Sequence, residues 1–590
     1  MKTKKTLFTA AGAVCLAASV AVTGFAATEH WNDNSGKTAI SKEWKNWKEK
    51  WETIKNDYEK ISLSPGADST KMNYAWYSKT PDQAKIRISN TPDMTTTTGQ
   101  SESNTYQENV TEFTGTSEKY KDIDEVSYYA NKVTVTGLKE NTTYYYQYFL
   151  NGEWSEVSHF TTGDTKSFSV MYVGDPQIGS SKGQTPSESE SAQTAEIAAR
   201  NDSFSWNKTL TAATKEHPEI DFMISAGDQI NNTKEDNPQE LEYAGFLSPR
   251  AMSSLPIAPT IGNHDSLFAN FQNHFNVPNP DTGEEGATAA GYDYFYSYGD
   301  VLFITLDTNN YNVASHEKLL QKAIASHKDA KWKIVTFHQD IYGSGKDHSD
   351  SDGIILRTQL TTLFDKYDID VVLQGHDHTY SRTYMLTSDG KEHKSYGSDA
   401  LQNADDTAKA EFQKENLCYK IVDKTQGTVT NPDGVLYMEA NSSTGSKFYN
   451  LIPTQQDYIA ARSQTWTPTY SVIDFNGDSL TINTYDVNTG KTIDKSFTIK
   501  KTEETTPTTI AVKKVTLNKT KLTLKKGKTA VLQASVTPKN ATNKKVTYTS
   551  SNKTVATVFQ NGKVTGKKAG TATITAKCGS KKATCKVTVK

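Results

Sequence analysis

The stretch VVLQGHDHTYSR, residues 371–382, places a short apolar run directly before a cluster of two histidines and an aspartate. Five other apolar runs along the chain also end at a metal-ligand or acidic residue type. They lead into Asp175, Asp228, Asn263, Asp307 and His338. Because ligands in layered α/β folds bind beyond the carboxyl ends of the strands, we expect these side chains to meet in one shared site.

The segments between these runs are longer, and several have helical spacing. One of them places Ile355, Leu356, Leu360, Leu363, Phe364 and Tyr367 on a single face. Near-continuous apolar strands separated by helices are typical of sheets that are covered by helices. Residues 165–500 are therefore predicted to form a layered α/β domain.

The residue types at the predicted strand ends indicate a metal site. Carboxylate, amide and imidazole side chains without thiolates suit iron, zinc or manganese. A single Gly-Asp after a strand is more commonly a turn, and a single histidine there is more commonly structural. The prediction therefore depends on the joint occurrence of these residues in order along the chain.

The first residues have the composition of a secretory signal. Three lysines within residues 2–5 precede a mostly apolar run over residues 7–22, and a cleavage site is expected near Ala27. A membrane anchor is the alternative, although the run is short for a bilayer span. We expect residues 1–27 to be removed and the protein to be extracellular or cell-wall-associated, in a Gram-positive-type bacterium.

An amphipathic helix is predicted over residues 38–61, before an all-β domain. Its apolar stripe consists of Trp44, Trp47, Trp51, Ile54, Tyr58 and Ile61. We expect this stripe to pack against a neighbouring domain, with a carbohydrate-binding face as the alternative. Residues 62–164 alternate in strand fashion, for example over residues 72–77 and 132–135, and are predicted to be all-β.

The C-terminal part of the chain differs from the rest in charge. Residues 501–511 have the composition of a linker, and residues 512–590 are predicted to be all-β. From Ala511 onward there are 19 lysines and no acidic residue, whereas the remainder has 46 basic against 68 acidic residues, a net charge of −22. This distribution argues against nucleic-acid binding by the main body. The lysines predict binding to an anionic cell-wall polymer, with solubility and spacing as the alternative.

The cysteines do not resemble a metal site. Cys578 and Cys585 flank a hairpin-like stretch, so they could form a disulfide outside the cell. Two reduced, buried residues are the alternative. Cys418 would then be unpaired.

The order GD…GD…GNHD…H…GHDH resembles the calcineurin-like metallophosphoesterases, and GHDHTYSR is most similar to the purple acid phosphatases. Ser64-Pro65-Gly66 and the strand over residues 142–148 resemble the fibronectin-III-like N-terminal domain of that family. Residues 555–558 and 569–576 resemble a group 2 bacterial immunoglobulin-like domain. The implied fold is multidomain. An all-β fibronectin-III-like domain precedes an α/β metallophosphoesterase with a four-layer β-sandwich flanked by helices, and an all-β Ig-like sandwich follows.

The resemblance implies a dinuclear centre. Metal 1 would be held by Asp175 and His378, and Asp228 would bridge both metals. Metal 2 would be held by Asn263, His338 and His376. Two nearby cations need a shared anion between them, which agrees with this distribution. The resemblance also implies that His264 is the general acid, oriented by Asp265.

The chain departs from the family pattern at two positions. Gln177 stands where many relatives have a histidine, and Asn231 stands where purple acid phosphatases have the tyrosine that binds ferric iron. Both amides are candidate ligands, and the purple tyrosinate-to-iron absorption is not expected. His348, Tyr380 and Arg382 are candidate substrate-binding residues, with structural roles as the alternative.

These features together predict a secreted, metal-dependent phosphoric ester hydrolase. Hydroxide supplied by the metal pair would attack a phosphate monoester while a histidine protonates the leaving group. A phosphodiesterase or nucleotidase with the same site is the first alternative. A cell-surface binding protein with a weakened metal site is the second. No membrane span is expected after signal cleavage.

Overall fold

A computed structural model gives the fold of the chain. It describes residues 33, 41–94, 110–187, 189, 191–283, 287–346, 348–349, 353–393, 405–502, 511–538 and 541–590. The predicted signal peptide and most of the predicted linker lie outside the described residues. The chain divides into two compact units, Met1–Lys501 and Thr502–Lys590.

The N-terminal helix is shorter than predicted. Helix α2 (Lys42–Ile54) begins after Ser41, whose hydroxyl accepts a hydrogen bond from the Trp44 backbone at 3.1 Å. Trp44 and Trp47 contact Phe204 of a neighbouring helix, with ring centroids 5.0 and 6.0 Å apart. The predicted packing against a neighbouring domain is therefore confirmed. Tyr58 and Ile61 follow the same spacing but lie beyond the end of the helix.

Two sheets form the N-terminal β-sandwich. One has the order β1-β2-β6-β5, and the other has the order β4-β3-β7-β8, with β9 paired to β7. The strands are β1 (Ser62–Pro65), β2 (Lys71–Ser78), β3 (Lys85–Ser89), β4 (Val110–Thr114), β5 (Thr116–Ile123), β6 (Val126–Thr136), β7 (Thr142–Leu150), β8 (Glu153–Trp154) and β9 (Ser158–Thr162). Their inner faces share a core of aliphatic and aromatic residues that includes Leu63, Trp76 and Tyr146.

The second domain has two seven-stranded sheets. The first has the order β12 (Ile257–Pro259), β11 (Ile220–Ser225), β10 (Ser167–Val173), β23 (Thr469–Asn476), β24 (Ser479–Asp486), β25 (Phe497–Lys500), β20 (Thr428–Thr430). The second has the order β13 (Tyr294–Tyr298), β14 (Val301–Thr305), β15 (Trp332–Thr336), β16 (Val371–Gln374), β21 (Leu436–Glu439), β17 (Tyr380–Thr383), β22 (Ile459–Ser463). A short pair, β18 (Met385–Thr387) and β19 (Lys420–Asp423), forms a separate two-stranded sheet.

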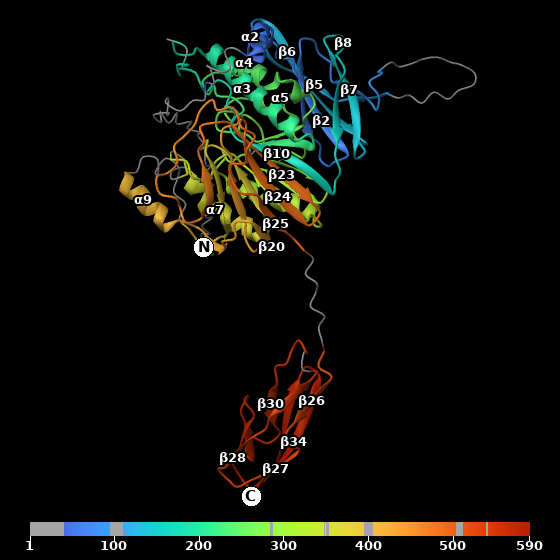
Figure 1. Ribbon diagram of the computed structural model, residues 1–590. Helices are drawn as coiled ribbons and strands as arrows, with labels where there is room; N and C mark the ends of the chain where they lie inside the picture. The colour runs from blue at the N-terminus through green and yellow to red at the C-terminus, as the bar shows by residue number, and fades with distance from the viewer. Residues whose placement is uncertain are drawn as a thin grey trace, which may run out of the picture. The chain divides into compact units, whose positions relative to one another are not determined.

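Helices cover the outer faces of both sheets, so the predicted four-layer architecture is confirmed (Figure 1). The helices are α3 (Ala195–Glu216), α4 (Asp236–Leu247), α5 (Asn270–His274), α6 (Val313–Ser326), α7 (Gly353–Lys366) and α9 (Asp406–Glu415), with a 3-10 turn at Arg250–Ser253. Residues of α3, α4 and α5 pack on the first sheet, and residues of α6 and α7 pack on the second. The aromatic-rich core between the sheets includes Phe168, Phe303 and Phe475.

Parallel strands bring the predicted ligand loops to one edge of each sheet. Strands β10, β11 and β12 are parallel neighbours in the first sheet, and β14, β15, β16 and β21 are parallel neighbours in the second. An isolated bridge between Gly174 and Ser442 joins the loops after β10 and β21. The carboxyl ends of the two sheets therefore meet, as the sequence pattern predicted.

The second unit is an Ig-like β-sandwich with a buried aliphatic core. Its strands are β26 (Lys514–Leu517), β27 (Lys521–Leu524), β28 (Thr529–Val531), β29 (Ala534–Thr537), β30 (Thr547–Ser550), β31 (Ala556–Val558), β32 (Lys563–Gly566), β33 (Gly570–Cys578) and β34 (Lys581–Val589).

The considered disulfide between Cys578 and Cys585 is absent. A two-residue turn joins β33 to β34, and the resulting register places Cys578 opposite Lys581 and Cys585 opposite Ile574. Both thiols are free and buried, as is that of Cys418. Across the described ranges, no helix is long and apolar enough to cross a bilayer.

Candidate metal centre

Each predicted ligand lies in a loop directly after a buried strand. Several of these residues have left-handed backbone conformations, with positive φ at Asp175 (43°), Gln177 (37°), Asp228 (49°), His376 (79°) and His378 (47°). Such conformations cost energy in residues other than glycine and gather at functional sites. The backbone of these loops is therefore strained at the residues whose side chains point into the candidate site.

Glycines permit the close approach of these loops. A Cβ atom on Gly375 would lie 2.6 Å from Oδ2 of Asp175, and one on Gly262 would lie 2.1 Å from Oδ1 of Asp228. Any other residue at either position would displace a carboxylate of the site. The glycines in the GNHD and GHDH motifs are thus explained by packing.

The two aspartates are buried and face imidazoles. The His376 backbone N–H donates to Asp175 at 2.9 and 3.1 Å, and Oδ1 of Asp175 lies 3.5 Å from Nε2 of His378. Oδ1 of Asp228 lies 3.5 Å from Nε2 of His338. Burial raises the pKa of Asp175 to about 7. Burial acts in the same direction on Asp228, but nearby imidazoles, chiefly that of His338, hold its pKa below the usual value.

Backbone carbonyls fix the tautomers of two histidines. Nδ1 of His338 lies 2.9 Å from the Ala226 carbonyl oxygen, and Nδ1 of His378 lies 2.8 Å from that of Lys447. Only an N–H can donate to a carbonyl, so Nε2 of each ring presents a lone pair to the site. This is the arrangement that metal-binding histidines adopt.

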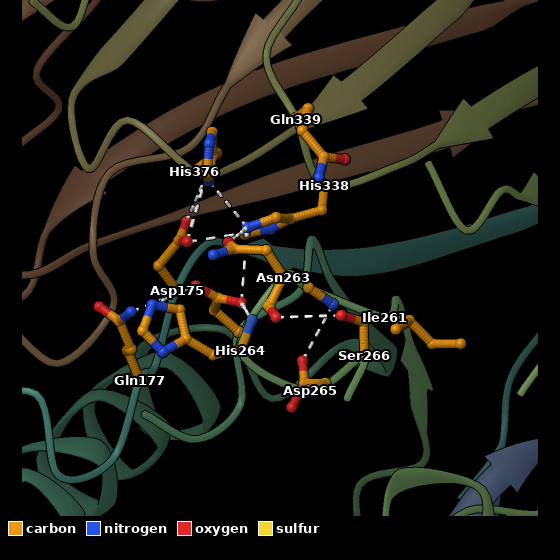
Figure 2. A network of polar contacts seen from close by, with 12 residues as sticks. Asp175, Gln177, Ile261, Asn263, His264, Asp265, Ser266, His338, Gln339 and His376 are labelled. Carbon is orange, nitrogen blue, oxygen red and sulfur yellow. Dashed lines mark hydrogen bonds and ion pairs between the residues drawn. The ribbon is translucent and has the colours of Figure 1, made fainter. Parts of the chain in front are cut away.

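The atoms around His338 suit a cation. Its Nε2 lies 2.9 Å from Oδ1 of Asn263 and 3.0 Å from Nδ1 of His376. One oxygen from each of Asp175 and Asp228 and a ring nitrogen of His338 lie within 4.8 Å of one another. Figure 2 shows Asp175, Asn263 and His376 around His338. Lone pairs from imidazole, amide and carboxylate groups thus converge on a small buried region, and a bound cation would relieve their mutual repulsion.

The two amides that replace family residues are placed differently. Gln177 donates through Nε2 to Asp228 at 3.2 Å, and its buried Oε1 has no hydrogen-bond partner among the described residues. That oxygen suits a metal ligand. Asn231 contacts the His264 ring through its backbone. Its carbonyl oxygen lies 2.5 Å from Nδ1 of His264.

The predicted acid His264 is more exposed than four of the predicted ligands. Its side chain is 21% exposed, whereas those of Asp175, Asp228, His338 and His378 are at most 2% exposed. Nε2 of His264 lies 3.8 Å from Oδ2 of Asp228. Burial lowers the pKa of His264, and the charge of Asp228 opposes that effect.

Asp265 has a different role from the predicted one. Its carboxylate accepts hydrogen bonds from the Gly262 and Gln229 backbones at 3.0 and 3.3 Å, and from the Tyr243 hydroxyl at 3.0 Å. The ring of His264 is oriented by the Asn231 carbonyl instead. Asp265 therefore stabilises the GNHD loop.

Helix α4 supports the loops of the first sheet, which sequence reasoning missed. Oε2 of Glu242 accepts hydrogen bonds from the Asn231 and Asn232 backbones at 2.8 and 2.7 Å. Nε2 of Gln239 donates to the Asn232 and His264 carbonyls at 2.7 and 3.3 Å. The loop that orients His264 is thus held by side chains three residues apart on one helix face.

A second group of buried carboxylates lies behind the histidines of the second sheet. It consists of Asp340, Asp377 and Glu439, with one oxygen of each within 4.8 Å of the others. The Ser349 hydroxyl contacts both aspartates, and Ser344 N–H donates to Glu439 at 2.9 Å. Burial raises the pKa of Glu439 to about 8. This group braces the loops that carry His338 and His376.

The candidate substrate-binding residues separate into two sets. The ring centroid of His348 lies 3.8 Å from that of His376, at the site. Tyr380 and Arg382 both bond Oδ2 of Asp494 at 2.8 Å and are buried between the sheets. Their assignment to substrate binding is therefore corrected. The two residues lie two positions apart on β17, so both side chains point to the same face of the strand, and that face lies in the core.

Comparisons with known proteins agree with this architecture. The model of the calcineurin-like phosphoesterases matches residues 168–380, and that of the purple acid phosphatase N-terminal domain matches residues 58–162. The model of the group 2 bacterial Ig-like domain matches residues 511–587. A purple acid phosphatase structure from yellow lupin (Lupinus luteus) seeds superposes with a TM-score of 0.51 at 15% identity, over 75% of each chain, which shows a shared fold.

Curated relatives match shorter segments. Acid phosphatase type 7 of Homo sapiens is 25% identical over 181 residues, which are 28% of this chain and 41% of that protein. Kappa-carrageenase of Pseudoalteromonas carrageenovora is 50% identical over 82 residues, which are 14% of this chain and 21% of that protein. The chain thus spans less than half the length of these relatives. It contains a purple acid phosphatase N-terminal domain, a calcineurin-like phosphoesterase domain and a bacterial Ig-like domain.

Proposed function

We propose that this chain, a metallophosphoesterase related to purple acid phosphatases, is a secreted enzyme that hydrolyses phosphate monoesters with two metal ions. One observation carries the proposal. Carboxylates from the loops after β10 and β11 meet imidazoles from the loops after β15 and β16 within a few ångströms.

The residues divide between two positions. Asp175, His378 and Oε1 of Gln177 would hold one metal, and Asn263, His338 and His376 would hold the other. Asp228 would lie between them, because its two oxygens face His338 on one side and Gln177 on the other. When bound, such a pair lowers the pKa of a water molecule and neutralises charge on the phosphoryl oxygens.

His264 is the residue proposed to protonate the leaving group. Its Nδ1 donates to the Asn231 carbonyl, so Nε2 is the atom that can carry a proton toward substrate. Its exposure of 21% leaves the ring within reach of a ligand. An anionic substrate beside the ring would raise its pKa and favour the protonated form that a general acid requires.

The Ig-like unit is proposed to retain the enzyme at an anionic cell wall. From Ala511 onward it has 19 lysines and no acidic residue, which attracts polyanions, and salt screens that attraction. The match to the group 2 bacterial Ig-like domain supports the proposal that this is a surface-associated bacterial protein.

A metal-dependent phosphate-release assay tests the enzymatic proposal. The purified chain would be stripped with a chelator and reloaded separately with iron, zinc and manganese, alone and in pairs. We expect hydrolysis of nitrophenyl phosphate to return with metal and to be lost in His338→Ala. Hydrolysis that survives chelation, or no hydrolysis of any phosphate ester with any metal, would contradict the proposal.

A further inference from the structure

The loop after β21 brings Lys447 to the metal centre. Strand β21 is parallel to β16, so its carboxyl end lies at the edge that carries His376 and His378. The Lys447 carbonyl oxygen lies 2.8 Å from Nδ1 of His378 and accepts a hydrogen bond from it. The backbone of Lys447 is therefore fixed directly beside a proposed ligand.

The side chain of Lys447 rests on an aromatic ring of the site. Its Nζ lies 4.6 Å from the centroid of the Tyr449 ring. That ring lies 5.1 Å from the His378 ring and 5.5 Å from the His348 ring. The Lys447 side chain is half-buried, so its ammonium is partly removed from bulk water and its charge is less screened.

The charge of Lys447 acts across the centre. Burial is the largest influence on the pKa of Asp175, His264 and His378, and the Lys447 ammonium also lowers the pKa of all three. These residues come from loops of both sheets. The cation first expected from the sequence, Arg382, is held by Asp494 and lies in the core.

We infer that Lys447 is a specificity-determining residue that recognises the second negative charge of a phosphate monoester. At neutral pH a phosphate monoester carries a charge of about −1.5 to −2, because its second pKa is about 6. A phosphodiester carries a single negative charge. A fixed ammonium beside the metal ligands attracts the more highly charged substrate more strongly.

This inference rests on the proposed function and concerns which class of phosphate ester the same site prefers. Removal of one partner of a hydrogen bond or ion pair to a charged group weakens the interaction with the substrate roughly 10–100-fold. The contribution should be nearly absent for a substrate that lacks the second charge.

The test compares nitrophenyl phosphate with bis(nitrophenyl) phosphate, which share a leaving group and differ in charge. Wild type, Lys447→Met, Lys447→Gln and Lys447→Arg would be measured with the same metal pair, together with the inhibition constant of inorganic phosphate. Met keeps the apolar stem on Tyr449, so it guards against a folding defect. Exposed Lys491 provides the matched control Lys491→Gln.

We expect Lys447→Met and Lys447→Gln to lower kcat/KM for the monoester roughly 10–100-fold, to lower it far less for the diester, and to weaken phosphate inhibition similarly. Lys447→Arg should restore most of the selectivity. Equal losses on both substrates, loss of bound metal, or an unchanged ratio would overturn the role of Lys447 while leaving the proposed function intact. An inactive wild type would instead overturn the proposed function and this inference together.

Discussion

The two sheets of the phosphoesterase domain contribute different chemistry to the same centre. Loops of the first sheet bring in the side-chain oxygens of Asp175, Asp228 and Asn263, which are the proposed oxygen ligands. Loops of the second sheet bring in the imidazoles of His338 and His376. Neither set alone could bind two cations and leave positive charge for an anionic substrate, so the site exists only where the sheets meet.

The two halves also differ in how they are held. Imidazoles of the second sheet donate to backbone carbonyls, as His338 does to Ala226. Loops of the first sheet depend on side chains of α4, including Glu242 and Tyr243. Because the carboxylates of Asp340, Asp377 and Glu439 brace the loops of the second sheet, each half depends on its own set of supporting side chains.

The largest expected effect is that of Asp228→Ala, which removes the carboxylate proposed to be shared by both metals. We expect at least one metal to be lost and activity to fall on every substrate, by more than the roughly 10–100-fold that loss of a supporting group costs. Elemental analysis and phosphate release on the same sample would check this. Retention of both metals would show that the two halves bind metal independently.

His264→Ala should give a large effect that depends on the leaving group. A general acid supplies roughly 10²–10⁴-fold in rate, and more basic leaving groups need it more. Alkyl phosphates should therefore slow much more than nitrophenyl phosphate, with metal content unchanged. Equal slowing of both substrates would reassign His264 to phosphate or metal binding.

The sequence predicted the strands, the layers and most of the centre, because metal-ligand types follow buried runs in the chain itself. It could not predict Lys447 or Glu242. Lys447 follows a Gly-Ser loop without a motif, and Glu242 acts through the backbone of other residues. It misplaced Tyr380 and Arg382, because closeness to a motif does not say which face of β17 a side chain takes.

Glu242→Ala tests whether α4 supports the first half. Loss of both acceptor contacts to the Asn231 and Asn232 backbones should loosen the loop that orients His264 and cost roughly 10–100-fold in activity. The loss should be larger for alkyl than for nitrophenyl phosphates. Exposed Glu235→Ala, at the start of the same helix, is the control and should behave as wild type.

The metal-free protein should become less stable between about pH 6.5 and 8. Burial raises the pKa of Asp202 to about 7 and of Glu242 and Glu439 to about 8, so the folded chain retains protons that the unfolded chain has lost. The lowered pKa values of His264 and His378 act in the opposite direction, but that effect fades as unfolded histidine loses its proton above about pH 6.5. Thermal midpoints should fall with rising pH, and Glu242→Gln should flatten the slope. Rising midpoints would contradict the assigned burial effects.

Deletion of residues 512–590 should have the smallest effect on catalysis. Because these residues belong to a separate compact unit, kcat/KM should stay within about twofold of the full chain. Binding to isolated cell walls should fall at low salt and converge with that of the full chain at high salt. Unchanged wall binding after deletion would remove the proposed retention role.

The metal content of the purified, reconstituted chain tests the central claim most directly. Elemental analysis against protein concentration should give about two metal ions per chain, as expected for a two-metal phosphoesterase. Full phosphatase activity with one metal ion or none per chain would contradict the account, because the two halves of the centre would then not act as a pair.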